Sequence, residues 1–162
     1  MHRFSARTVV ILLCCLITSL LSAQTPVQGE SEMDLYIDSL ERVLASAKED
    51  THKVQLLNSL CIQYQQVDNE KSLEYGFNAL DLSTTLQYRN GVFQSYDFIG
   101  STYYYIGNYS KALEYFQKRL KLIVPEDVEN MAQCYQEIGN AYSGQGNYFS
   151  GLEYCNKAAA LF

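Results

Sequence analysis

The chain has 162 residues, of which 12 are Lys or Arg and 18 are Asp or Glu, and its formal net charge is −6. A chain this acidic repels phosphate backbones, so its charge argues against nucleic-acid partners and against anionic membrane surfaces. Its length suffices for one domain with a continuous core.

The first 23 residues have the three parts of a secretory signal peptide. Arg3 and Arg7 precede an uncharged apolar run from Val9 to Leu21, and small residues lead to Ala23. This run is shorter than the roughly 20 residues that span a bilayer. We predict cleavage after Ala23 and export to the periplasm or the extracellular space, without membrane insertion after cleavage. An uncleaved membrane anchor is the second choice. With the two arginines removed from the 12 basic residues, 10 basic and 18 acidic residues remain, a net charge of −8.

The next two segments lead from this signal to the repeats. Residues 24–30 are polar and are predicted to form a flexible lead-in. Segment 31–49 begins with Ser31, and Asp34 follows three residues later, which matches the signature of a helix N-cap. Apolar residues then recur at helical spacing. We expect one helix that ends near Lys48 and packs across the end of the helices that follow.

Three further segments, 50–91, 92–125 and 126–162, are each predicted to form two antiparallel helices joined by a tight turn. In the middle segment small residues let the helix axes approach, and aromatic side chains fill the remaining space. The positions that carry this pattern are Tyr96, Ile99, Gly100, Tyr103, Gly107, Asn108, Tyr109, Ala112 and Phe116. The last segment repeats them as Tyr135, Ile138, Gly139, Tyr142, Gly146, Asn147, Tyr148, Gly151 and Cys155.

The first of the three segments is a degenerate copy, in which Cys61 takes the position of Gly100. The intervals from Cys61 to Gly100 and from Gly100 to Gly139 are both 39 residues. We expect the second helix of the degenerate copy to end at Asn90-Gly91, because this pair is a helix stop signal. Cys61 and Cys155 occupy small or apolar slots, which favours buried fillers over a disulfide.

This pattern resembles the tetratricopeptide repeat, a helix-turn-helix unit of about 34 residues. The resemblance covers roughly Val54 to Phe162. It implies an all-α solenoid of antiparallel helix pairs, a right-handed superhelix with about seven helices after the signal peptide. The longer period predicts lengthened second helices and links between repeats. Arg119 stands where the family usually has Ala, and we expect its charged head to reach water along its stem.

The resemblance also implies a concave groove lined by the first helix of each pair. Its ligand-facing positions are Gln94, Asp97, Ser101, Tyr104, Gln133, Gln136, Asn140 and Ser143, and in the degenerate copy Gln55, Asn58, Ile62 and Gln65. Of the three consecutive tyrosines, Tyr103 is expected in the core, Tyr104 in the groove and Tyr105 near the turn. Amide and hydroxyl groups pair with the backbone of an extended peptide without needing charge on it. A plain solvated surface is the alternative.

Two functions remain open. The first is an exported, noncatalytic scaffold that binds a protein or peptide, and no catalytic, metal or cofactor residue is assigned because His52 is the only histidine after the signal. The second is the sensory part of a membrane signalling protein, since the pattern also resembles extracytoplasmic repeat arrays of bacterial sensor histidine kinases. The sequence stops on an apolar helix at Phe162, so we expect either that the natural chain is longer or that a partner or a second copy of the chain covers this end.

Overall fold

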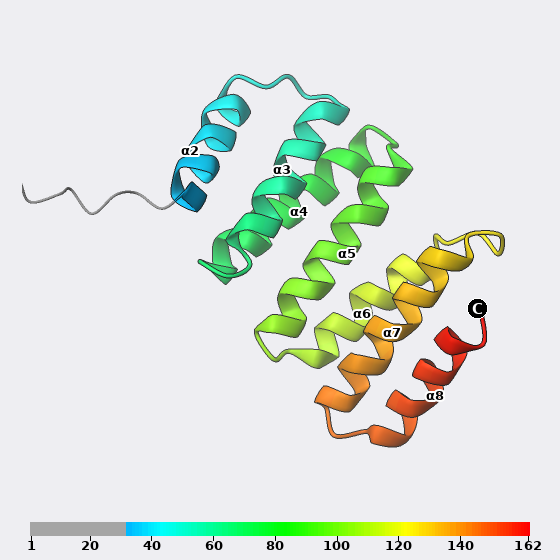
Figure 1. Cartoon of the computed structure of the whole chain (residues 1–162). Coiled ribbons are helices and arrows are strands. Elements are labelled where there is room, and N and C mark those ends of the chain that lie inside the picture. The colour runs from blue at the N-terminus through cyan, green and yellow to red at the C-terminus, as the bar shows by residue number, and fades with distance from the viewer. Residues whose placement is uncertain (1–31) are drawn as a thin grey trace, which may run out of the picture. The chain divides into compact units, whose positions relative to one another are not determined.

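The computed structural model describes residues 32–162, and the predicted signal peptide, lead-in and Ser31 cap lie outside them. Residues Leu35–Phe162 form one compact unit. The described part has seven helices and no strand (Figure 1). They are α2 (Glu32–Ala45), α3 (Thr51–Tyr64), α4 (Asn69–Thr85), α5 (Arg89–Tyr105), α6 (Tyr109–Leu120), α7 (Val128–Gly144) and α8 (Tyr148–Ala159). The predicted all-α solenoid of helix pairs is confirmed.

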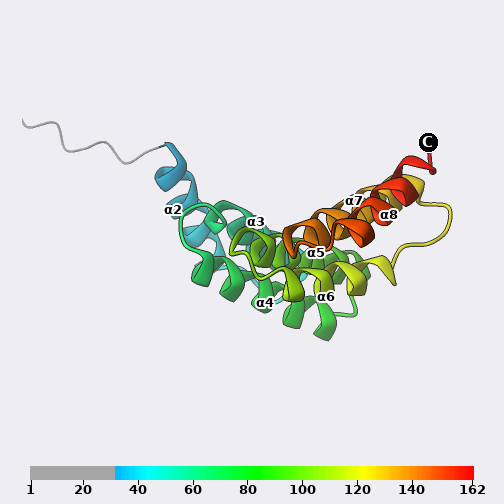
Figure 2. The same ribbon diagram turned by 90° about the horizontal axis from the view of Figure 1, so that it is seen from below.

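Consecutive helices from α3 to α8 pack against one another, and α3 also contacts α5 (Figures 1 and 2). Polar side chains fix where five of these six helices begin, because each accepts a hydrogen bond from a backbone N–H group of the first turn, whereas α5 has no such cap. The capping residues with such bonds are Asp50, Asp68, Asn108, Asp127 and Asn147. In the turns inside the last two pairs, Gly107 and Gly146 adopt left-handed φ angles of 81° and 80°, which a glycine adopts without steric cost.

Glycines at the predicted positions set the distance between the two helices of each later pair. A Cβ atom on Gly100 would lie 2.7 Å from the ring of Phe116, and one on Gly139 would lie 2.9 Å from the sulfur of Cys155. The two glycines therefore face equivalent residues of the partner helix, which confirms the 39-residue register. In the degenerate pair the small residue has moved to the partner helix, where Gly76 lies against Cys61.

The three cysteines of the described part are free. Cys61 and Cys134 are fully buried in the helix interfaces, and Cys155 is half-buried on α8. The prediction of apolar fillers rather than a disulfide is confirmed for Cys61, and Cys155 fills its slot with part of its surface still exposed.

A stacked tyrosine pair recurs in every helix pair and marks the repeat in three dimensions. The ring centroids lie 5.5 Å apart for Tyr64 and Tyr75, 5.7 Å for Tyr103 and Tyr115, and 5.6 Å for Tyr142 and Tyr154. In each pair the ammonium group of a lysine lies over one of the two rings, 4.4 to 4.8 Å from the ring centroid. These lysines are Lys71, Lys111 and Lys157, in the order of the pairs. The most N-terminal pair also binds α2, because Glu41 accepts hydrogen bonds from both of its tyrosine hydroxyls.

Two expectations about helix ends are wrong. The second helix of the degenerate copy ends at Thr85 rather than at Asn90-Gly91, and the chain turns at Gln87, whose φ angle is 53°. Gly91 instead lies in the first turn of α5. A Cβ atom on Gly91 would lie 2.8 Å from the Cβ atom of Ser83 on α4, so the close packing of the two helices requires a glycine at this position.

The prediction about the extra length of the repeats is correct in part. In the middle copy the second helix, α6, has 12 residues and the first helix, α5, has 17. In this copy the added residues therefore lie in the first helix and in the predicted longer link between Leu120 and Val128, rather than in α6. In the degenerate copy the second helix is the longer one, as predicted, since α4 has 17 residues and α3 has 14. The first predicted helix is also shorter than expected, since α2 ends at Ala45.

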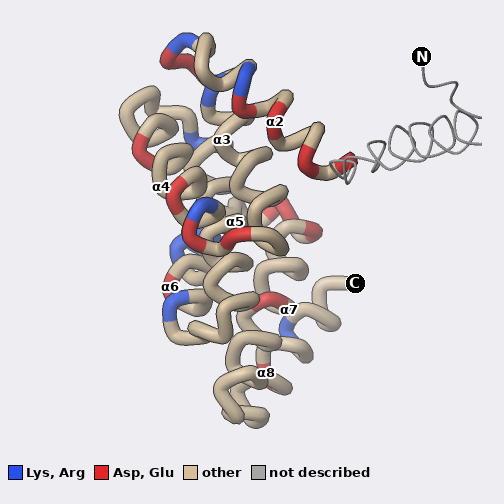
Figure 3. The backbone as a smooth tube through the Cα atoms, turned by 90° about the vertical axis from the view of Figure 1, so that its left-hand side faces the viewer, with Lys and Arg blue, Asp and Glu red and all other residues tan. Residues whose placement is uncertain are grey.

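The outer face of α8 exposes large apolar side chains, of which Phe149 is 83% exposed and Leu152 is 62% exposed. Charged residues are sparse on this helix (Figure 3), and its Glu153 and Lys157 form an ion pair. Within the described residues no helix combines the length and apolar character that a membrane span requires.

Candidate functional site

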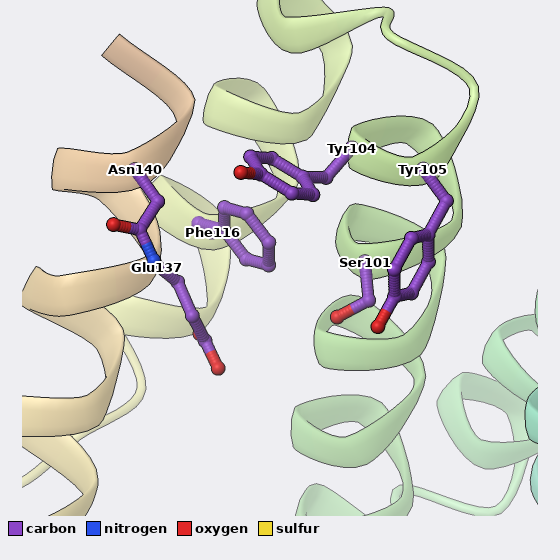
Figure 4. A pocket seen from close by; sticks show the side chains of 6 residues that line it. All are labelled: Ser101, Tyr104, Tyr105, Phe116, Glu137 and Asn140. Atoms are coloured by element: carbon purple, nitrogen blue, oxygen red, sulfur yellow. The ribbon is translucent and has the colours of Figure 1, made fainter. Parts of the chain in front are cut away.

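A pocket of about 220 Å³ lies between α5 and α7, over one ring of α6 (Figure 4). Its lining residues are Ser101, Tyr104 and Tyr105 from α5, Phe116 from α6, and Glu137 and Asn140 from α7. In Figure 4 the two α7 side chains face Ser101 and Tyr105 across the pocket, and the rings of Tyr104 and Phe116 lie between them. The pocket thus combines ring surfaces with a carboxylate, an amide and hydroxyl groups.

Three of the eight predicted groove residues meet here, namely Ser101, Tyr104 and Asn140. The consecutive helical positions 103, 104 and 105 point in different directions, as expected from about 100° per residue. Tyr103 is buried in the core, whereas Tyr104 is half-buried in the pocket. Tyr105, which is expected near the turn, lies there 63% exposed and also lines the pocket.

Asp97, another predicted groove residue, is held in a buried ion cluster. Arg119 of α6 donates from one guanidinium nitrogen to Asp97 Oδ1 at 3.0 Å and to Glu137 Oε2 at 2.5 Å. The guanidinium carbon also lies 4.7 Å from the ring centroid of Phe93. With 1% of its surface exposed, Arg119 does not reach water. The expectation that it does is wrong, because two carboxylates from the neighbouring helices supply its partners inside the interface.

This cluster has two carboxylates for one guanidinium. Burial, as the larger cause, and the charge of Glu137 raise the pKa of Asp97 from 3.8 to about 6, against the opposing effect of Arg119. Above that pH the three side chains together carry one net negative charge. Beside them, burial raises the pKa of the Cys134 thiol to about 12, so this sulfur stays protonated and donates to the Phe116 carbonyl oxygen at 3.2 Å.

Two predicted residues line a second pocket, of about 450 Å³, between α7 and α8. Gln133 and Gln136 face Cys155 and Ala158 of α8 there, together with Phe162. The side-chain amide of Gln133 donates to Glu137 Oε1 at 2.9 Å. This bond occupies the oxygen of Glu137 that does not contact Arg119. The Glu137 carboxylate therefore belongs to the ion cluster, lines the pocket between α5 and α7, and bonds to a residue of the second pocket.

The remaining two predicted residues are placed apart from the pocket lining. The Ser143 hydroxyl donates to the Gly139 carbonyl oxygen at 3.0 Å, and its side chain faces Gly151 of α8. Gln94 is half-buried on α5. Their roles in binding stay predictions.

In the degenerate copy, two of the corresponding positions are used inside the fold. Asn58 is buried and accepts a hydrogen bond from Ser95 at 3.1 Å. Gln65 donates to Phe98 and Thr102 of α5. Gln55 and Ile62 are exposed.

The arrangement in the pocket suits binding through ring faces and hydrogen bonds. Among residues 32–162 no group of three or more His, Cys, Asp or Glu side chains is placed to hold a metal ion. Glu137 is the pocket's only carboxylate, and its two oxygens are bonded to Arg119 and Gln133. Sequence reasoning missed Glu137 and Arg119, and the one available signal was the arginine at a position where the repeat usually has alanine.

This helical stack is a solenoid of the tetratricopeptide-repeat type, and solved structures share it. BtubC from P. vanneervenii superimposes with a TM-score of 0.73 at 18% identity, over 80% of this chain and 56% of that one. The STAND protein PH0952 from Pyrococcus horikoshii, described as having a tetratricopeptide repeat sensor, gives 0.72 at 22% identity, over 81% of this chain and 21% of that one. The MamA protein gives 0.62 at 23%, over 81% of this chain and 64% of that one.

These likenesses, at 18% to 23% identity, show the fold. The chain spans 56% and 21% of the lengths of the first two of those structures. No family model and no curated protein sequence matches the chain. The predicted tetratricopeptide-type architecture is confirmed.

Proposed function

We propose that the chain is a noncatalytic scaffold, exported from the cell, that binds a protein or peptide on the face formed by α5 and α7. The observation that carries this proposal is the pocket between these helices, in which three predicted groove residues meet. Helical repeats present such surfaces because each first helix contributes a row of side chains to one continuous face. The fold of the structural neighbours supports an interaction scaffold.

Selection from random peptides tests this function, because it needs no assumption about the partner's sequence. A displayed library of random peptides is selected against the full chain, and the affinity of enriched peptides is measured by fluorescence anisotropy. We expect Tyr104→Ala and Asn140→Ala to weaken binding by about tenfold each, the loss of one well-made contact. The matched control is Gln117→Ala, at an exposed position of α6 outside the pocket. A library without enriched peptides, or equal losses in all three variants, would refute the proposal.

A second candidate is the sensory part of a membrane signalling protein. It is favoured by the likeness to PH0952, whose description includes a tetratricopeptide repeat sensor. An antibody against residues 32–162, applied to fractions of the source cells, separates the two candidates. A membrane-bound product clearly larger than 18.5 kDa supports the signalling protein. A smaller exported product that begins at Gln24 supports the scaffold and the predicted cleavage.

A further inference from the structure

We propose that the pocket between α5 and α7 binds an alkylammonium group, the charged head of a lysine side chain or of a small amine. For lysine, this inference rests on the proposed function and gives the partner its chemistry: a peptide segment that presents a lysine to the α5 and α7 face. Three features of the pocket favour such a ligand: the charge of its wall, its ring surfaces and its hydrogen-bond acceptors.

The first feature is the uncompensated charge beside the pocket. Glu137 lines the pocket and shares Arg119 with Asp97. One guanidinium thus faces two carboxylates, and no Lys or Arg of the described residues lines the pocket. Charges interact more strongly in such a partly buried site than in bulk water. A second cation in the pocket would complete the neutralisation, whereas a carboxylate or phosphate would add a third negative charge.

The second feature is the ring surface. Tyr104, Tyr105 and Phe116 line the pocket, and the rings of the two tyrosines lie 6.2 Å apart at an angle of 76°. Aromatic faces attract cations within about 6 Å of the ring centroid. The chain already uses this contact, with Lys71 and Lys111 each 4.8 Å from a tyrosine centroid in the described repeats. The pocket presents the same type of surface without a lysine of its own.

The third feature is the set of acceptors, which selects a primary ammonium group over a quaternary one. A lysine ammonium group has three N–H donors. The Glu137 carboxylate, the Ser101 hydroxyl and the Asn140 amide oxygen can accept from it, and they come from both sides of the pocket. A trimethylammonium group would meet the same rings but would leave these acceptors without donors. The volume of about 220 Å³ accommodates the ammonium group and the methylenes next to it.

The experiment titrates the full chain with matched probes, observed through the NMR signals of the tyrosine rings. The probes are n-butylammonium chloride and the capped peptide Gly-Gly-Lys-Gly-Gly, with its norleucine, acetyl-lysine and trimethyl-lysine analogues. Chain variants are Glu137→Gln and Tyr105→Leu, of which the second alters a side chain that lies mostly outside the packed core. Glu129→Gln is the control, because it removes the same charge from α7 at an exposed site outside this pocket.

We expect the lysine peptide and butylammonium to shift the signals of Tyr104 and Tyr105. Acetylating the lysine, replacing it by norleucine, or the variant Glu137→Gln should each lower the affinity of the peptide about tenfold or more. Glu129→Gln should bind like the parent chain. Equal binding of the lysine and norleucine peptides would overturn the ammonium pocket while the scaffold function stands. Binding of butylammonium with Glu137 dependence, but of no peptide, would support the ammonium pocket and count against peptide binding. No binding of any probe up to about 10 mM would overturn the inference.

Discussion

Replacing Asp97 by Asn tests the electrostatics of the buried ion cluster, because it removes one of the two carboxylates that share Arg119. The pKa of Asp97 is raised from 3.8 to about 6 in the folded chain, mainly by burial. A raised folded-state pKa means that the folded chain holds this proton more tightly than the unfolded chain. Stability is therefore lost as the pH rises from about 4 through 6, and the loss is complete above that window.

The size of this loss follows from the two pKa values. At about 1.36 kcal/mol per pH unit, the difference between 3.8 and 6 corresponds to about 3 kcal/mol at high pH. The part that develops between about pH 4.5 and 7.5 is about 2 kcal/mol. Asn keeps an oxygen that accepts from Arg119 and has no proton to lose, so Asp97→Asn should gain about 2 kcal/mol relative to the parent chain over this interval.

Urea unfolding followed by circular dichroism, in a series from about pH 4.5 to 7.5, measures this difference. The control is Asp81→Asn, which removes an exposed carboxylate from α4 and should change little with pH relative to the parent chain. The opposite trend would refute the reasoning. If Asp97→Asn loses stability against the parent chain as the pH rises, then Arg119 outweighs burial and the charge of Glu137 in setting the pKa of Asp97.

Three further predictions concern packing and surface. Gly100→Ala places a Cβ atom 2.7 Å from the ring of Phe116 and should lower the free energy of unfolding by about 1 to 3 kcal/mol in urea titration; an unchanged value would contradict the close approach. With Cys14 and Cys15 changed to Ser, a thiol reagent should modify Cys155 well before the other two cysteines, which are buried, and simultaneous modification would contradict their burial. Self-association through α8 should appear in light scattering and be weakened by Phe149→Asp, whereas a monomer at all concentrations would count against it.

The repeat architecture was predictable because its signals are local and recur. Gly100 and Gly139 occur 39 residues apart, each with an aromatic or apolar partner on the next helix. The end of α4 was misplaced because Asn90-Gly91 is a local stop signal that packing overrides. Gly91 serves the close approach to Ser83, and Gln87 makes the left-handed turn instead.

The ion cluster was not predictable from helical spacing. Arg119 lies 22 residues from Asp97 and 18 from Glu137, on three different helices. These side chains come together only when neighbouring repeats pack against one another in the folded chain. The family pattern placed Asp97 in a groove as a ligand-facing residue and gave Glu137 no role. That pattern assigns each position separately, so it does not show that Arg119 on α6 would bind carboxylates of α5 and α7. Ser101, Tyr104 and Asn140 follow the repeat itself, and the structure brings these three predicted groove residues together in one pocket, while their role in binding stays a prediction.

The central claim is that the face formed by the first helices of the pairs, α5 and α7, carries the binding function. Hydrogen–deuterium exchange of the full chain, with and without a saturating selected peptide, tests it most directly. We expect slower exchange on binding in residues 94–105 and 133–144, with smaller changes in residues 109–120, which contribute Phe116 to the pocket, and in residues 148–159. Protection confined to the second helices α6 and α8 would contradict it.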